Sequence, residues 1–240
     1  MADNFRLLII PCLNPDGRER FPFEITPSDP DEAVRYKQGI WKDGTLAEYN
    51  VCTRVHPISD AVSYMGGYFN DGGVNLYADN YFSPMSPENR ALFSLVDNEA
   101  PDIVLFLHTG CHKHGKLLQP YYVPAFIEKH VMEFDEKLHS SFKAGGYTYY
   151  SLAEHGPYSP LDDVYPPPRL PMETAIHFAC GALSIVYESK DAVCSADSPF
   201  FLEHILDCHF TLFEQAALYA QEFQQACFAL CNGRGLRRGF

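Results

Sequence analysis

Two side chains that can carry out proton-transfer or metal chemistry, His108 and Glu188, each follow a short apolar run. The runs are IVLFL at 103–107 and LSIVY at 183–187, and each predicts a buried strand. Because ligands bind outside the carboxyl ends of strands in open α/β sheets, we expect both side chains in one cleft. A histidine and a carboxylate there suit metal-assisted hydrolysis. The alternative is a histidine that only caps its strand and a glutamate that is only solvated.

The elements that would position these side chains alternate between strands and helices, which predicts a layered α/β domain. Residues 6–10 predict a further buried strand that enters an Asn-Pro-Asp-Gly turn at 14–17. Residues 18–85, rich in Gly, Pro, Tyr and Asp, predict long loops with short strands. Helices are predicted from Ser86, as N-cap, to about Asn98, over 124–143, over 171–180, and from 198 or 199 to about 227.

The bulk composition limits the possible partners. The 240 residues predict a single domain at 1–230 and a flexible basic tail at 231–240. The net charge of -13 argues against nucleic acid or an anionic membrane as partner, because both need a basic face. Neither of the longest apolar runs approaches the roughly 20 residues of a membrane helix. The start lacks a signal-peptide pattern, and the eight cysteines include no Cys-x-x-Cys pair, so we expect reduced thiols in a cytoplasmic protein.

Six short motifs stand in an order that resembles the zinc carboxypeptidases of the carboxypeptidase A type. Over roughly residues 5–190 they read Ile10-Pro11 with Asn14-Pro15-Asp16-Gly17, Trp41-Lys42, Gly73-Val74-Asn75-Leu76, Ser86-Pro87-Glu88 with Arg90-Ala91-Leu92, Pro101-Asp102 up to His108, and Gly181-Ala182-Leu183-Ser184 up to Glu188. Each motif alone is common, and the specific signal is their shared order. The resemblance implies a three-layer α/β/α fold with a mixed, mostly parallel sheet, a zinc cofactor, and a peptide or related amide as substrate.

The resemblance also implies roles for three residues. In that family two histidines and a glutamate hold the zinc, and His108 matches the histidine at a later strand end. Glu188 matches the catalytic glutamate, a general base that activates the attacking water and passes its proton to the leaving amine. Lys42 follows Trp41, where the family places an arginine that polarises the scissile carbonyl. A lysine there acts as a point charge and not as a bidentate fork.

Substrate-binding residues follow from the same resemblance. The family grips the substrate's terminal carboxylate with an Asp-x-Asn-Arg stretch, and the corresponding region here contains Asp79 and Asn80 but no arginine. We therefore expect weak binding of a free C-terminal carboxylate, and an amidated, cell-wall or side-chain-linked substrate is equally possible. Tyr158 or Tyr165 stands where the family has a mobile tyrosine. Packing of these tyrosines against the neighbouring prolines is the alternative.

The largest departure from the family concerns the other two zinc ligands. The family's His-x-x-Glu motif should precede Asn14, yet residues 1–13 contain no histidine, so the chain is expected to be N-terminally truncated relative to the family. His130 and Glu133 form a His-x-x-Glu, but inside a predicted helix after His108, where an ordinary polar face is the simpler interpretation. A site rebuilt from His108 and the Cys-His-Lys-His run at 111–114 is a further alternative.

Three interpretations of the function therefore stay open. The first is a zinc peptidase or amidohydrolase whose complete form carries the missing ligands upstream. The second is a catalytically inactive carboxypeptidase-like domain that binds a peptide in the same cleft. The third is a fragment that folds poorly alone, because the loss of early strands exposes sheet edges and apolar faces.

Overall fold

A computed structural model describes residues 5–20, 30–48, 58, 60–81, 85–110, 115–118, 125–155, 170–190 and 202–230. The main sheet of this described part has the order β3-β5-β4, formed by Ile103–Gly110, Leu183–Lys190 and Lys116–Leu118 respectively. β3 and β5 run parallel, whereas β4 runs antiparallel to β5. The prediction of a mixed sheet is confirmed. Among the described strands, however, β3 and β5 form the one parallel pair, so the described sheet is not mostly parallel.

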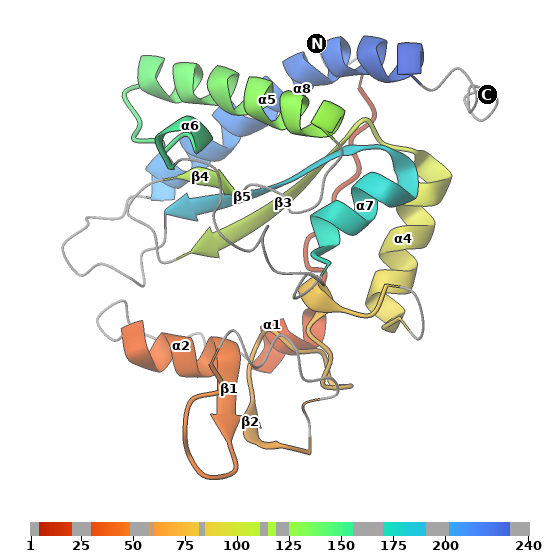
Figure 1. Cartoon of the computed structure of the whole chain (residues 1–240). Coiled ribbons are helices and arrows are strands. Elements are labelled where there is room, and N and C mark those ends of the chain that lie inside the picture. The colour runs from red at the N-terminus through yellow and green to blue at the C-terminus, as the bar shows by residue number, and fades with distance from the viewer. Residues whose placement is uncertain are drawn as a thin grey trace.

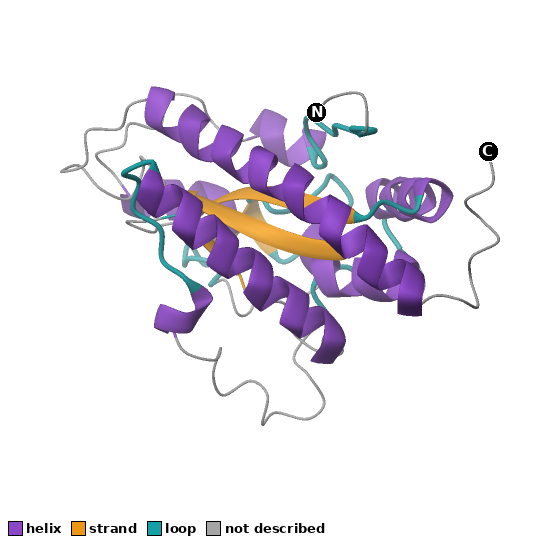
Figure 2. Ribbon diagram, turned by 90° about the horizontal axis from the view of Figure 1, so that it is seen from above, coloured by secondary structure: helices purple, strands orange, loops and turns teal. Residues whose placement is uncertain are grey.

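Helices cover both faces of this sheet, which gives the three layers expected from the sequence (Figure 1). α5 (Ala125–Ala144) and α8 (Leu202–Leu230) lie side by side over one face, as the view from above shows (Figure 2). α4 (Pro87–Glu99) and α7 (Met172–Cys180) lie on the other side of the sheet. All four helices were predicted, with bounds that differ by a few residues.

Alternate side chains of the long strands enter two separate cores. On one face of β5, Leu183, Ile185 and Tyr187 pack among apolar residues of α5 and α8. On the opposite face of β3, Val104 and Phe106 pack against α4 and α7. Successive side chains of each strand therefore alternate between the two cores. This alternation sets the register of the strands, because a slip by one residue would exchange the two faces.

Local sequence signals explain the ends of α4 and α7. The Ser86 hydroxyl accepts a hydrogen bond from the Asn89 backbone N–H at 3.4 Å, and Pro87 follows at the first helical position. α4 ends at Ala100, which has a left-handed φ of 44°. α7 ends at Gly181, whose φ of 78° is readily adopted by a residue without a Cβ. Gly181 then leads directly into β5.

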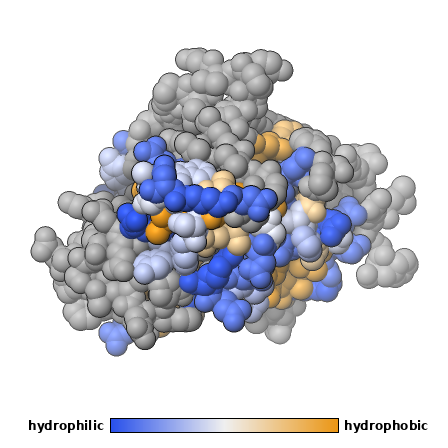
Figure 3. All heavy atoms as spheres, turned by 90° about the horizontal axis from the view of Figure 1, so that it is seen from below, coloured by the Kyte–Doolittle hydropathy of each residue, from blue (hydrophilic) through white to orange (hydrophobic). Residues whose placement is uncertain are grey.

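A second, smaller sheet lies apart from the main one (Figure 1). Its strands β1 (Gly39–Trp41) and β2 (Val62–Met65) are antiparallel and enclose a small core of Ala47, Ile58, Val62 and Phe69. The described surface on the side seen from below is mostly hydrophilic (Figure 3).

The remaining short elements of the described part are α1 (Pro15–Arg20), α2 (Pro30–Gln38), η2 (Leu76–Ala78) and α6 (Leu152–His155).

Two predictions for the N-terminal part were wrong. The apolar run at 6–10 forms no strand and is exposed, with Leu7 78% and Ile9 73% accessible. The Asn-Pro-Asp-Gly residues do not form an isolated turn, because α1 begins at Pro15. The side-chain oxygen Oδ1 of Asn14 accepts a hydrogen bond from the Gly17 backbone N–H at 3.1 Å. A helix, α2, also lies in the region predicted to be loops with short strands. An apolar run becomes a buried strand only where a partner supplies its hydrogen bonds, and none pairs with 6–10 in the described part.

The structure tests the predictions on membrane helices and on reduced cysteines only for the residues that it describes. No described helix combines the length and the apolar character needed to cross a membrane. Cys12, Cys180 and Cys208, the cysteines that the structure describes, are free thiols. The predicted basic tail at 231–240 lies outside the described residues.

Candidate functional site

His108 and Glu188 lie next to each other on the main sheet. The parallel register of β3 and β5 pairs them directly, and the His108 Nδ1 atom is 3.0 Å from the Glu188 Oε1 atom. The two side chains therefore lie next to each other, as expected, whereas a cleft around them stays a prediction. Both strands continue for two residues beyond this pair, to Gly110 and Lys190, so the predicted strand ends were too early.

Burial differs sharply between the two partners. The Glu188 side chain is 8% exposed, whereas the His108 side chain is 48% exposed. The alternation of the strands places both on the face that α4 and α7 cover further along the sheet, since Val104, Phe106 and His108 are two residues apart. The Ser189 hydroxyl donates to the His108 backbone carbonyl at 3.3 Å and ties the strands together beside the pair.

The second carboxylate oxygen of Glu188 has no partner. Its Oε2 atom is buried and makes no hydrogen bond to any described residue. Buried polar atoms are nearly always hydrogen-bonded, so this oxygen calls for a donor such as water or a ligand. Glu188 thus has the His108 imidazole 3.0 Å from one oxygen, and its other oxygen is buried without a described hydrogen-bond partner. This arrangement suits a carboxylate that accepts a proton from a bound molecule.

Lys116 lies on the other side of Glu188. The antiparallel register of β4 and β5 places the two residues directly opposite each other, so their side chains leave the same face of the sheet. Burial lowers the pKa of Lys116, and the negative charge of Glu188 partly opposes that shift. His108, Glu188 and Lys116 therefore form a row across all three strands. Sequence reasoning did not find Lys116, because the pairing of β4 with β5 leaves no local signal in the sequence.

The donor atoms of the described residues do not by themselves fit a catalytic zinc. Such a zinc needs about three protein ligands, and His108 and Glu188 supply one nitrogen donor and one carboxylate. No group of three or more His, Cys, Asp or Glu side chains with metal-binding geometry occurs in the described part of the chain. Cys111, His112 and His114, which the locally rebuilt site requires, lie outside the described residues.

The structure does not bring Lys42 to the His108–Glu188 pair. Lys42 is exposed in the turn that follows β1, and its backbone N–H donates to the Ala61 carbonyl at 3.3 Å. Figure 1 shows this small sheet well apart from the carboxyl ends of β3 and β5. In the described arrangement the cation next to Glu188 is Lys116.

Asp79 is occupied by its own chain. Its carboxylate accepts hydrogen bonds from the backbone N–H groups of Asn80 and Ser86, at 2.7 and 2.8 Å, and from the Asn89 side-chain amide at 2.9 Å. These bonds hold the start of α4, a structural task that the substrate-binding prediction did not foresee. Asn80 itself is exposed. Tyr158 and Tyr165, the other predicted substrate-binding residues, lie outside the described residues.

The His-x-x-Glu of α5 takes part in helix packing. The Tyr219 hydroxyl of α8 donates to the Glu133 Oε2 atom at 2.9 Å, and the His130 Nδ1 atom lies 2.9 Å from the same hydroxyl. Since that hydroxyl hydrogen is directed to Glu133, His130 must carry its hydrogen on Nδ1 and donate to the hydroxyl oxygen. The network joins α5 to α8, which supports the interpretation of a polar helix face.

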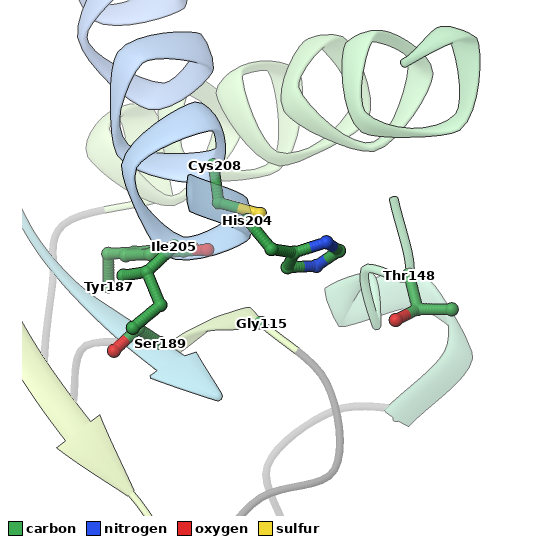
Figure 4. Close-up of a pocket in the computed structure, with 7 residues that line it drawn as sticks. All are labelled: Gly115, Thr148, Tyr187, Ser189, His204, Ile205 and Cys208. Carbon is green, nitrogen blue, oxygen red and sulfur yellow. The ribbon is translucent and has the colours of Figure 1, made fainter. Parts of the chain in front are cut away.

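A small cavity on the opposite face of the sheet is a separate feature. It lies between the end of β5 and α8, and Figure 4 shows the residues that surround it, namely Gly115, Thr148, Tyr187, Ser189, His204, Ile205 and Cys208. Burial raises the pKa of the Cys208 thiol to about 11, so the thiol stays protonated at neutral pH and is a poor nucleophile. Cys208 is therefore not a reactive group of this cavity, which lies on the other face of the sheet from the row of His108, Glu188 and Lys116.

Comparisons with known proteins supply no family for this chain. No family model matches the sequence, and neither a curated protein nor a solved structure matches it. The likeness to carboxypeptidases thus stays a prediction that rests on the six motifs, and the geometry of the row carries the functional argument.

Proposed function

We propose that the chain is a carboxypeptidase-like hydrolase that cleaves a peptide or related amide bond, with Glu188 as general base. One observation carries the proposal: a carboxylate with an 8% exposed side chain lies with one oxygen 3.0 Å from an imidazole nitrogen, while its other oxygen lacks a described partner. A carboxylate placed beside an imidazole in this way can take up and return a proton during hydrolysis. A carboxypeptidase-like fold belongs to the same proposal.

The reaction steps follow from the two side chains. The Glu188 Oε2 atom takes a proton from a water molecule as the water oxygen attacks the scissile carbonyl carbon. The same carboxyl group then gives that proton to the leaving amine as the C–N bond breaks, which leaves Glu188 ionised again. His108 holds the other oxygen and keeps the carboxylate in one orientation. The products are an amine and a carboxylic acid, which then releases its remaining proton to water.

The need for zinc is a separate part of the proposal. When bound, zinc polarises a carbonyl and lowers the pKa of water. The described donors are too few to hold the metal by themselves. His108 would need partners among residues 111–114, which lie outside the described residues. Metal analysis of purified wild type and of His108→Ala tests this: about one zinc per chain that is lost in the variant supports a zinc site, and absence of zinc in wild type excludes a resident zinc in this chain.

The hydrolase proposal is tested by Glu188→Gln. This change keeps the shape of the side chain but removes the base, so we expect turnover of N-acylated peptide amides and free peptides to fall by about 10²–10⁴-fold. Glu203→Gln, at an exposed position in the first turn of α8, is the matched control and should leave turnover unchanged. Equal far-UV circular dichroism and melting temperature show that both variants fold. Turnover of Glu188→Gln at the wild-type rate would refute Glu188 as base.

A second candidate function is peptide binding without catalysis. It is favoured by the small number of described metal donors and by the engagement of Asp79 in the start of α4. It predicts that isothermal titration detects peptide binding while neither wild type nor any variant hydrolyses a substrate. The proposed partner is in either case a peptide or amide, with no nucleic acid, and the proposed location is the cytoplasm.

A further inference from the structure

The row across the sheet contains a cation that the motifs did not indicate. Glu188 of β5 pairs with His108 of β3 on one side and with Lys116 of β4 on the other. The three side chains therefore leave the same face of the sheet. Directly opposite residues of antiparallel strands have Cβ atoms about 4.5–5.5 Å apart, which puts the lysine stem beside the carboxylate. Because β5 lies between β3 and β4, His108 and Lys116 approach Glu188 from opposite sides, and the His108 Nδ1 atom is 3.0 Å from one carboxylate oxygen.

The Lys116 ammonium is not neutralised by a close ion pair in the described part of the chain. The lysine and arginine side chains that form ion pairs there are Arg6, Arg20, Lys129 and Lys137. Lys116 is not among them. The lysine is half-buried, and partial removal of a charge from water is costly unless something negative offsets it. Glu188 supplies part of that offset. A partly desolvated cation that a neighbouring carboxylate offsets only in part can also attract a negative charge that arises on a bound molecule.

We propose that Lys116 stabilises the negative charge that develops on the scissile carbonyl oxygen during hydrolysis. This inference rests on the proposed function. It assigns to Lys116 the task that the motifs gave to Lys42, which lies on the other sheet. As the attacking water loses its proton to Glu188, the carbonyl oxygen becomes an oxyanion, and the adjacent ammonium faces that charge as a point cation without any proton being transferred.

The test combines turnover with the binding of a charged analogue. Lys116→Met keeps most of the apolar stem and removes the charge, whereas Lys116→Arg keeps the charge. We expect Lys116→Met to lower kcat by about 10²–10³-fold with little change in KM, as the loss of one oxyanion donor does in other enzymes. The kcat of Lys116→Arg should be at least tenfold higher than that of Lys116→Met. Lys143→Met, at an exposed position of α5, is the control and should behave as wild type.

Binding of a phosphinic peptide, which carries a tetrahedral anionic group in place of the scissile amide, is measured by isothermal titration for the same variants. Lys116→Met should weaken it at least tenfold but leave the binding of the uncharged amide peptide within about twofold. If wild type and Lys116→Met turn over equally while Glu188→Gln is inactive, the Lys116 role is refuted and the hydrolase proposal survives. If wild type shows no turnover, the hydrolase proposal fails. In that case selective weakening of phosphinate binding still supports Lys116 as the anion contact, and equal or absent binding overturns it.

Discussion

His177 links the pH dependence of stability to the segment that leads into β5. Its Nδ1 atom lies 2.6 Å from the Ala182 carbonyl oxygen, so the neutral imidazole carries its hydrogen on Nδ1 and donates there. His177 is 5% exposed, and its Nε2 atom has no hydrogen-bond partner among the described residues. Burial therefore lowers the pKa of His177 from 6.5 to about 4. A buried neutral histidine of this kind makes folding less favourable in acid.

The size of the effect follows from the two pKa values. Below pH 6.5 the unfolded chain binds a proton that folded His177 does not accept until about pH 4, so the free energy of unfolding falls as the pH falls. At about 1.36 kcal/mol per pKa unit, the loss between pH 7 and pH 4 is about 3 kcal/mol. Above pH 7 neither state binds this proton, and the contribution vanishes.

Urea unfolding followed by circular dichroism measures this term. Wild type and His177→Asn, whose side-chain amide can still donate to Ala182, are compared at pH 7, 6, 5 and 4.5. The variant is expected to be less stable at pH 7 but to lose less stability as the pH falls, so the two curves converge. Burial also lowers the pKa of His209, and His209→Asn should change the slope in the same direction by a smaller amount. Parallel curves for wild type and His177→Asn would refute the assignment.

Three further substitutions test a helix cap, a close packing contact and a buried carboxyl group. Ser86→Ala removes the N-cap of α4 and should lower the free energy of unfolding by about 1 kcal/mol in urea titrations, with no loss if the cap is unimportant. Gly115→Ala would place a Cβ 2.6 Å from the hydroxyl oxygen of the buried Tyr187, so a loss of about 1–3 kcal/mol is expected in the same assay, and an unchanged value would contradict the packing next to β4. Burial raises the pKa of Asp135, although the Tyr149 hydroxyl bonded at 2.5 Å opposes it. The Asp135 contribution to stability should therefore fall as the pH rises from about 4 through the raised pKa, opposite in sign to the contribution of His177. Stability should then rise more steeply with pH in Asp135→Asn than in wild type, and an identical pH dependence would count against the assignment.

The parts of the fold that the sequence predicted correctly carry their signals locally. The Ser86-Pro87 start of α4 depends on one hydroxyl and one ring, both within the first turn. The apolar runs before His108 and Glu188 are buried by helices that are themselves amphipathic, so strands formed where they were expected. The run at 6–10 has an equally apolar composition but no partner strand in the described part, and composition alone could not reveal that difference.

The candidate site divides in the same way. The proximity of His108 and Glu188 could be predicted, since parallel strands end at the same edge of a sheet. Lys116 and Asp79 could not be assigned from the sequence, because one depends on the pairing of β4 with β5 and the other on hydrogen bonds to a helix seven or more residues away. Both are consequences of tertiary pairing that residue types alone do not encode.

The register of β3 against β5 is the feature on which the whole row depends. A shift by one residue would send either His108 or Glu188 to the α5–α8 face and separate the 3.0 Å contact. Such a shift would also remove the Ile185 and Tyr187 side chains from the core beneath α5 and α8. The hydrophobic packing on both faces therefore opposes the shift. The position of the proposed proton-transfer pair is therefore set by the buried apolar residues that precede Glu188 in β5, Ile185 and Tyr187. Core substitutions at Ile185 are expected to weaken catalysis through this register, without contact with any substrate.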